Sequence, residues 1–441
     1  MDFRSILRPA YAYCHRMNSP ELHTNHNVYI LGAGFSADAG LPTIATFMRV
    51  LRDAGEHYKH SGNDQNAKAI TQVLEYRLRA AGAAYRCSMD PENIEDLFSL
   101  IDMEGNPRQL DSGEDYIRQA IAATIEFARR AHTPQTLRLV LANAPGMKDP
   151  LPGKAAGATG PTRHERFLSL YDAYLAAMTG MLYDPEPHRR DTIVTFNYDT
   201  LVEEALANLH KPYDYGFLPE EYSDGNGGGF VTITPDCPTQ LIKGRKEAGV
   251  RILKLHGSVN WGLRSAQSHK PSESTAELLV CPTFDALMSH EVDRVFIEPP
   301  TWRKGYGTQG RGITTVWSNA LAALRTASRI IVIGYSLPLT DVHFRYLLAA
   351  GLRENISLQE ILFVNPALTE KAPGSQGMVA RIFQILRPEL RERGVIRFRA
   401  DYLKHELIRS PGIPLEHHKE SLFGTVNQNA GNRTPPFTTT T

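Results

Sequence analysis

The chain has 441 residues, of which 42% are hydrophobic and 22% charged, a composition that is ordinary for a globular protein of about two or three domains. Lysine plus arginine (48) equals aspartate plus glutamate (48), which excludes a global basic field for nucleic acid and an acidic disordered chain. The cysteines Cys14, Cys87, Cys237 and Cys281 form no CxxC pair, which argues against a structural metal site or a disulfide framework. Without a leader or a long apolar run, we expect a cytoplasmic protein with no membrane contact, no metal and no direct nucleic-acid binding.

The first elements in chain order predict a strand followed by a glycine-broken turn and a helix. Residues 1–26 predict a short helix and linker. Residues 27–31 (NVYIL) predict a buried strand, and residues 41–55 (LPTIATFMRVLRDAG) predict a helix with Pro42 in its first turn.

Residues 61–184 predict a helical module inserted into the rest of the fold. Four segments have apolar residues at helical spacing: AKAITQVLEYRLRAAG, NIEDLFSLIDM, GEDYIRQAIAATIEFARRAH and RFLSLYDAYLAAMTGML. We expect no strand between them. Residues 144–162, which are rich in proline and glycine, predict a loop inside this module.

Strands and helices alternate again after this module. Candidate strands are 191–196, 250–256, 277–282, 329–335 and 360–364, and candidate helices are 198–209, 314–327 and 340–353. Buried β-rich runs with helical crossovers predict an α/β fold, a Rossmann-like parallel sheet with helices on both faces. We assign 27–60 and 185–408 to this nucleotide-binding domain, with a loop at 222–230, and 409–441 to a C-terminal extension with a disordered end.

The stretch VYILGAGFSADAGLPT (28–43) has the small-residue spacing of a phosphate-binding turn. Gly32 and Gly34 would allow positive φ and close approach to a pyrophosphate, and Ala37 completes the G-x-G-x-x-G/A pattern before a helix N-terminus. A plain tight turn is the alternative. A dehydrogenase would also need an acid about 20 residues on, after a second strand. Asp53 has that spacing but falls inside the predicted helix, so the turn fits a nucleotide and not an ordinary hydride-transfer enzyme.

Polar residues follow several predicted strands, where ligands of parallel sheets bind. Asn197 and Asp199 follow one strand, and His256 follows another. Hydroxyl-bearing residues follow Gly334, and Asn365 follows a fourth strand. Each has a structural alternative, because Asn and Asp cap helices and start turns and a single histidine is often structural. Together and in this order, they predict a ligand site.

Five runs resemble the sirtuin fold in sequence and order: GAGFSADAGLPT, TFNYDTLVEEAL, KLHGSVNW, IGYSLPLTDVHF and FVNP. The resemblance covers about residues 27–366. The sequence resembles most the bacterial sirtuin-like proteins that consume NAD in anti-phage defence. The segments NIEDLF and EPPTWRK also resemble sequences of that branch. The two CxxC pairs of the zinc lobe of deacylating sirtuins are missing, which favours NAD hydrolysis over acyl-lysine chemistry.

The resemblance implies a role for each matching position. Asn197, His256 and Asp199 would be catalytic. The residues that would bind NAD are Gly32, Ala33, Gly34, Phe35 and Ser36 on the pyrophosphate and ribose side, Thr195 beside Asn197, Gly334, Tyr335 and Ser336 at the adenosine phosphates and ribose, and Asn365 at the adenine ribose. Phe35 and Tyr198 stand where deacylases commonly have smaller aliphatic residues.

The activity implied is that of an NAD+ glycohydrolase, with NAD+ as substrate and no metal, acting as an NAD-depleting effector of abortive infection. The resemblance also implies homo-oligomerisation and control by a HerA-type ATPase, a short Argonaute or a phage trigger. Three alternatives remain: an NAD-dependent protein deacylase, a cyclase that forms cyclic ADP-ribose, and a non-enzymatic sensor of NAD or ADP-ribose.

Overall fold

The computed structural model describes residues 26–104, 113–132, 136–142, 163–181, 190–216, 220–223, 229–233, 250–265, 276–290, 292–301, 311–338, 341–369 and 377–403. Four predictions lie wholly or mostly outside these residues: the N-terminal helix, the loop at 144–162, the centre of the loop at 222–230 and the C-terminal extension.

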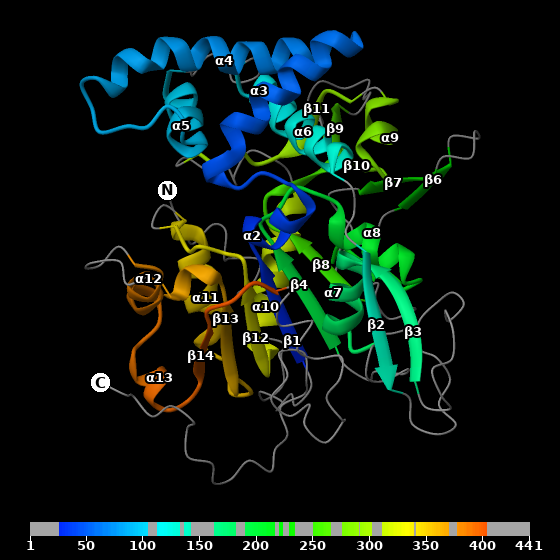
Figure 1. Ribbon diagram of the computed structural model, residues 1–441, viewed down its shortest axis with the longest axis vertical. Coiled ribbons are helices and arrows are strands. Elements are labelled where there is room, and N and C mark those ends of the chain that lie inside the picture. The colour runs from blue at the N-terminus through cyan, green and yellow to red at the C-terminus, as the bar shows by residue number, and fades with distance from the viewer. Residues whose placement is uncertain are drawn as a thin grey trace.

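A seven-stranded sheet forms the centre of the molecule (Figure 1). Its order is β14 (Ile396–Arg399), β13 (Glu360–Val364), β12 (Arg329–Ile333), β1 (His26–Leu31), β4 (Arg190–Thr195), β8 (Val250–Lys254) and β5 (Tyr213–Asp214). All of these neighbours pair in parallel. Every residue of β1, β12 and β13 is buried, as expected for strands covered on both faces. The Rossmann-like sheet that the sequence predicts is therefore confirmed.

Helices cover both faces of this sheet. The chain runs from β1 outward through β4 to β8, and from β12 in the opposite direction through β13 to β14. Right-handed crossovers in opposite directions place their helices on opposite faces. One face carries α8 (Leu201–Asn208) and α7 (Leu170–Met178), which pack together. The other carries α10 (Arg311–Thr326), α11 (Val342–Leu352) and α12 (Met378–Ile385), before the short α13 (Glu389–Glu392).

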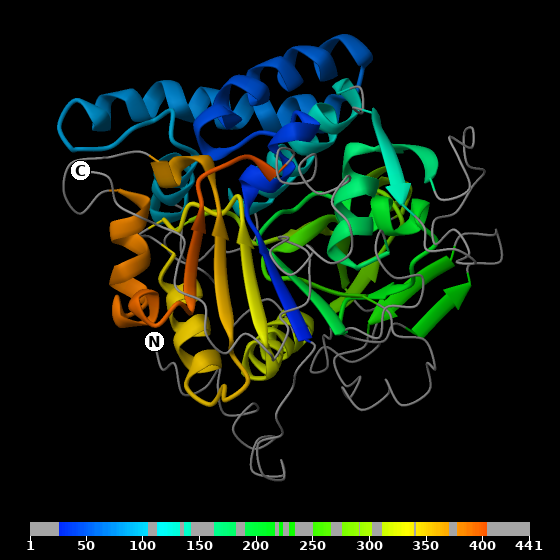
Figure 2. The ribbon, with the colours of Figure 1, turned by 60° about the horizontal axis from the view of Figure 1, so that its bottom comes forward.

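A helical layer lies across the end of the sheet to which the strand arrowheads point (Figure 2). It comprises α3 (Ile44–Ser61), α4 (Asp64–Ala84), α5 (Ile94–Glu104) and α6 (Gly113–Ala131), and α3 packs on α4 and α6. Thr43 caps α3 through a capping box, so Pro42 precedes the helix rather than lying in its first turn as predicted. No helix of the described ranges is long and apolar enough to cross a membrane.

A second sheet of five antiparallel strands is a correction to the predicted topology. Its order is β11 (Arg294–Ile297), β9 (Gly257–Ser265), β10 (Ala276–Val280), β7 (Gly229–Ile233) and β6 (Glu220–Ser223). The predicted strand 277–282 belongs here and not to the parallel sheet, because it pairs antiparallel with β9 and no described helix separates the two. The predicted loop at 222–230 overlaps β6 and β7, and its centre, 224–228, lies outside the described residues. The sheet packs against α6 and α9 (Phe284–Met288).

A two-stranded hairpin interrupts the block that the sequence predicts to be helical. Strands β2 (Thr136–Ala142) and β3 (Arg163–Ser169) pair antiparallel, so the prediction of no strand in residues 61–184 is wrong. Leucines at 137, 139 and 141 recur with the period of a strand rather than that of a helix. Residues 166–169, expected in a helix, belong to β3, and Ser169 caps α7 by accepting a hydrogen bond from the Asp172 amide (3.1 Å).

Candidate active site

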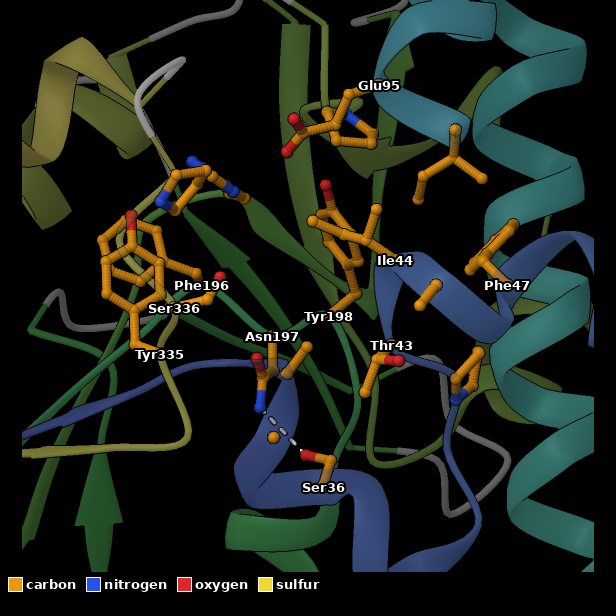
Figure 3. Close-up of a pocket in the computed structure, with 18 of the residues that line it drawn as sticks. Ser36, Thr43, Ile44, Phe47, Glu95, Phe196, Asn197, Tyr198, Tyr335 and Ser336 are labelled. Carbon is orange, nitrogen blue, oxygen red and sulfur yellow. Dashed lines mark hydrogen bonds between the residues drawn. The ribbon is translucent and has the colours of Figure 1, made fainter. Parts of the chain in front are cut away.

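A cavity of about 620 Å³ lies between the carboxyl ends of the parallel strands and the helical layer (Figure 3). We call its strand-end side the floor: Ala33, Gly34, Ser36, Phe196, Asn197, Tyr198, Asp199, His256, Gly334, Tyr335, Ser336 and Asn365. We call its helical side the roof: Ile44, Ala45, Phe47, Ile94, Glu95, Asp96, Ser99, Ile121 and Ile125. The sides are Leu41, Pro42, Thr43, Pro300, Thr301, Pro338 and Asp341. The floor thus brings together ten of the thirteen site residues that the sequence predicts.

The order of the strands sets the order of the floor residues. Asn365 follows β13, Gly334 follows β12, and Gly34 follows β1. Asn197 follows β4, and His256 follows β8. Five neighbouring strands spaced by about 4.8 Å span roughly 19 Å, which suits an elongated ligand. The chain reverses its direction of travel between β1 and β12, the switch point at which ligands of doubly wound sheets bind.

The glycines of the first turn serve a backbone contact rather than an unusual torsion angle. Gly32 has φ −108°, and Gly34 lies in the one-turn helix α2 (Ala33–Ser36), so the prediction of positive φ is wrong. A Cβ on Gly34 would lie 2.8 Å from the Gly334 carbonyl oxygen, to which the Gly34 amide donates a hydrogen bond (2.8 Å). Gly334 itself has φ +62°. These residues are glycine because two chain segments cross at contact distance.

Three predicted site residues lie behind the floor instead of lining it. Gly32 donates its amide to the Ile333 carbonyl (3.0 Å) and packs against Tyr335. The Phe35 ring is buried against two aromatic rings of α7, those of Tyr171 (5.4 Å between centroids) and Tyr174 (5.9 Å).

The third, Thr195, accepts a hydrogen bond through its hydroxyl from the backbone N–H of Asn197 (3.0 Å). That hydroxyl also donates to the Leu31 carbonyl (3.4 Å), which ties the end of β4 to the end of β1. Thr195 therefore supports Asn197 from below.

A chain of hydrogen bonds fixes the orientation of the Asn197 amide. The Ser36 hydroxyl donates to Asp199 Oδ2 (2.7 Å), and Asn197 Nδ2 donates to Ser36 Oγ (2.9 Å) and to the Gly32 carbonyl (3.0 Å). A carboxylate only accepts, so Ser36 must donate to Asp199 and can accept only from the Asn197 nitrogen. The Asn197 oxygen is left facing away from Ser36 and into the cavity (Figure 3).

His256 is buried in the floor between two aromatic residues that follow β4. Its ring meets that of Phe196 edge to face (5.2 Å between centroids) and lies 6.3 Å from that of Tyr198. The Glu298 amide donates to the His256 carbonyl (2.9 Å), and Gly257, with φ +75°, turns the chain into β9. The next floor residue, Tyr335, stacks on Phe196 at 4.7 Å and donates its hydroxyl to Asp341.

Tyr198 reaches from the floor toward the roof (Figure 3). Its hydroxyl donates to the Glu298 carbonyl (2.7 Å). Burial, followed by the negative charges of Glu298, Glu95 and Asp341, raises the pKa of Tyr198 well above its ordinary value. Tyr198 is therefore a neutral hydrogen-bond donor at neutral pH.

A buried ion pair supports the floor from beneath. Lys254, 1% exposed, contacts Glu203 (3.0 Å) and donates to the Asp199 carbonyl. Ser258 donates its hydroxyl to the Tyr198 carbonyl (3.1 Å). Residues 197–199 are thus held by strands of both sheets.

The roof is the part of the site that the sequence did not predict. One of its segments had a signal, because NIEDLF supplies Ile94, Glu95 and Asp96, and EPPTWRK supplies Pro300 and Thr301 of the sides. Ile121 and Ile125 of α6 had none beyond ordinary helical periodicity. Among the described residues, no three histidine, cysteine or acidic side chains gather as metal ligands would.

The site can be compared with known proteins. Similar solved structures include a mutant Sir2 homologue with 2′-O-acetyl ADP-ribose (13% identity, 94% of this chain and 100% of that chain, TM-score 0.34). A second is a mutant Sir2 homologue with ADP-ribose (12% identity, 93% of this chain and 96% of that chain, TM-score 0.35). A third is a Sir2 homologue–NAD complex (13% identity, 90% of this chain and 97% of that chain, TM-score 0.30). No curated protein matches the sequence significantly. Residues 191–373 match the family model described as a SIR2-like domain. These residues begin at β4 and include Asn197, Asp199, His256, Gly334 and Asn365, so the chain contains a SIR2-like domain that carries much of the floor.

Proposed function

We propose that the protein is an NAD+ hydrolase that cleaves the nicotinamide–ribose bond to give nicotinamide and ADP-ribose. The SIR2-like domain supports an NAD-dependent enzyme of the sirtuin type. The observation that carries the proposal is the joint placement of Ser36, Asn197, Asp199 and His256 on the floor of one cavity. Binding alone requires neither a buried imidazole nor an amide oxygen directed into the cavity.

The sheet order supports one direction of binding along the floor. Adenosine would lie at the ends of β12 and β13, beside Tyr335 and Asn365. The pyrophosphate would lie at the end of β1, near Ser36. The nicotinamide ribose would lie at the ends of β4 and β8, between Asn197 and His256.

The reaction divides between breaking the glycosidic bond and adding water. When the ribose C1′–N bond breaks, its electron pair neutralises the nicotinamide nitrogen and positive charge passes to the ribose, as in glycoside hydrolysis. The leaving group is neutral and needs no acid. The Asn197 oxygen would accept a hydrogen bond from the attacking water or a ribose hydroxyl, and His256 would take the proton of the water as it bonds to C1′.

Asp199 acts through its neighbours in this scheme. Its carboxylate accepts hydrogen bonds from the Ser36 hydroxyl and from the Leu201 backbone amide (3.1 Å). Asp199 therefore fixes the direction of the hydrogen bonds that orient the Asn197 side chain. The resemblance implies that Asp199 is catalytic, whereas in this scheme it positions Asn197.

Nicotinamide release from NAD+ tests the proposal. General-base catalysis contributes about 10²–10⁴-fold, so His256→Ala should lower the rate by that range, and Asn197→Ala should lower it comparably. His60→Ala and Asn208→Ala, at exposed positions away from the cavity, are the matched controls. Undiminished release by both site variants would refute the assignment.

Product analysis distinguishes the alternatives. Chromatography separates ADP-ribose from cyclic ADP-ribose, and an acyl-peptide assay with NAD+ detects a deacylase.

We further propose that the enzyme depletes NAD+ in anti-phage defence as a homo-oligomer under a trigger, with a HerA-type ATPase or a short Argonaute as candidate partners. Assays with and without the products of neighbouring genes test this control.

A further inference from the structure

Glu95 is one of two carboxylates, with Asp96, that the helical layer presents to the cavity, and the mechanism above uses neither. It lies in the first turn of α5 and, with Ser99 one turn later, lines the roof. In Figure 3 its carboxylate lies beyond the Tyr198 hydroxyl, across the cavity from Asn197 and Ser36. Tyr198 follows β4, and its ring lies 6.3 Å from that of His256, which follows β8, so Glu95 lies above the ends of these two strands.

The orientation of α5 is set by packing, which fixes where Glu95 points. Ile94, Leu97, Phe98 and Ile101 are buried in the core of the helical layer. The Asn93 side chain accepts a hydrogen bond from the Glu95 amide (2.9 Å), and Glu92, just before the helix, pairs with Arg52 (2.6 Å). Rotation of α5 would expose this apolar face, so Glu95 stays on the cavity side.

The charge of the cavity wall is one-sided. Its described lining residues include four acids, Glu95, Asp96, Asp199 and Asp341, and no lysine or arginine. Asp199 lies on the floor, Asp341 on the sides, and Glu95 and Asp96 on the roof. Of the two roof acids, Glu95 is the one whose carboxylate Figure 3 shows across the cavity from Asn197 and Ser36.

We infer that Glu95 contacts the nicotinamide riboside half of NAD+ and balances the positive charge that this half carries. The inference rests on the proposed function. NAD+ has its only positive charge on the nicotinamide ring, and bond cleavage moves that charge to the ribose. A carboxylate above this end attracts the charge in the bound substrate and in the transition state, within a cavity that screens it less than water does. ADP-ribose lacks the positive charge and gains nothing from Glu95.

The test compares two ligands in a background that does not consume them. Isothermal titration calorimetry of His256→Ala, alone and combined with Glu95→Gln, Glu95→Asp or Glu56→Gln, measures the affinities for NAD+ and ADP-ribose. Glu56 is exposed on α3 and pairs with Lys59, so Glu56→Gln controls for a lost charge in the same layer. We expect Glu95→Gln to weaken NAD+ binding about tenfold and to change ADP-ribose binding less than about twofold. Glu95→Asp, which keeps the charge, should lose less.

The outcomes separate the two proposals. If the wild type releases no nicotinamide and His256→Ala binds no NAD+, the proposed function fails and the inference fails with it. If it binds NAD+ and Glu95→Gln weakens both ligands equally, or neither, the inference alone is overturned, because a merely structural glutamate does not discriminate by the charge of the ligand. A kinetic readout adds to this: with intact His256, Glu95→Gln should lower kcat for nicotinamide release as well as raise KM.

Discussion

The floor and the roof of the cavity are built from different kinds of interaction. The floor is held by backbone hydrogen bonds between strand ends, such as Gly34 to Gly334 and Gly334 to Val364 (3.1 Å). The roof is held by apolar side chains of α3, α5 and α6, with few polar groups reaching the cavity. The difference indicates that the floor holds its polar side chains on rigid backbone, while the size of the cavity is set by packed helices.

The largest expected effect is on the backbone crossing beneath the floor. Gly334→Ala places a Cβ 2.2 Å from the Phe35 nitrogen at φ +62° and should lower the free energy of unfolding by at least about 3 kcal/mol. Gly62→Ala, at φ +74° at the end of α3 with nothing within 4 Å, should cost only about 1–2 kcal/mol. Chemical denaturation measures both. Equal losses would contradict the assignment of a tight crossing to Gly334.

The next effect concerns the direction of the hydrogen bonds between Asp199, Ser36 and Asn197 in the floor. Asp199→Asn replaces an obligate acceptor with an amide that can donate to Ser36, which allows the Asn197 amide to turn. We expect kcat for nicotinamide release to fall about 10- to 100-fold with KM little changed, since misplaced reacting groups cost up to about that factor. Asp53→Asn on the exposed face of α3 is the control. A selective rise in KM would instead indicate direct contact between Asp199 and NAD+.

A smaller effect is expected in the roof. Ile121→Val removes one methylene from a side chain that is buried and lines the cavity. It should cost about 0.5–1.5 kcal/mol of stability and leave kcat unchanged, because this apolar side chain supplies packing rather than chemistry. Denaturation and steady-state kinetics on the same preparation check both numbers. A tenfold loss of kcat would show that the apolar side chains of the roof also affect the chemical step.

The smallest effect compares two thiols. Cys87, between α4 and α5, is exposed, whereas Cys281 is buried after β10, where its carbonyl accepts from Asn260 (2.6 Å). Burial raises the pKa of the Cys281 thiol to about 11, so at pH 8 it is neutral and unreactive. Iodoacetamide at pH 8 followed by peptide mass spectrometry should show Cys87 modified and Cys281 modified only after unfolding. Modification of Cys281 in the native protein would mean that the structure around the end of β10 opens to solvent.

Because this thiol keeps its proton longer in the folded state than in the unfolded state, it also gives a small pH dependence. The unfolded chain binds fewer protons between about pH 9 and 11, so the contribution of Cys281 to stability is lost as pH rises through that window.

The sequence predicted the floor well because of where its residues stand. Strands such as β1 and β12 are continuous apolar runs, and the polar residues that follow them meet at one edge of the sheet. The roof was not predictable in the same way. Ile121 contacts the cavity and the helical core at once, and apolar periodicity looks the same for both. The strand pairings that were missed have a similar cause: β6 and β7 are short, and β2 lies between helical segments that obscured its alternation.

The glycine turn was predicted, but the backbone contact that requires its glycines was not. Its spacing indicated a phosphate cradle, which remains a prediction, and the closest neighbour of Gly34 is the chain at Gly334, which is 300 residues away in sequence. A pattern read along one segment does not reveal a partner so distant.

The hydrogen bonds between the ends of β1, β12 and β13 have a consequence for how the molecule opens. The amides of Gly34 and Gly334 each donate across strand ends, so exposing either to solvent requires separating the central sheet. Their hydrogen exchange should be limited by global unfolding. Amides of α4, which borders the molecule on its outer side, should exchange through local fluctuations (Figure 1). On this expectation, local fluctuations of the helical layer would admit a ligand, while the strand ends that would act on the ligand stay in place.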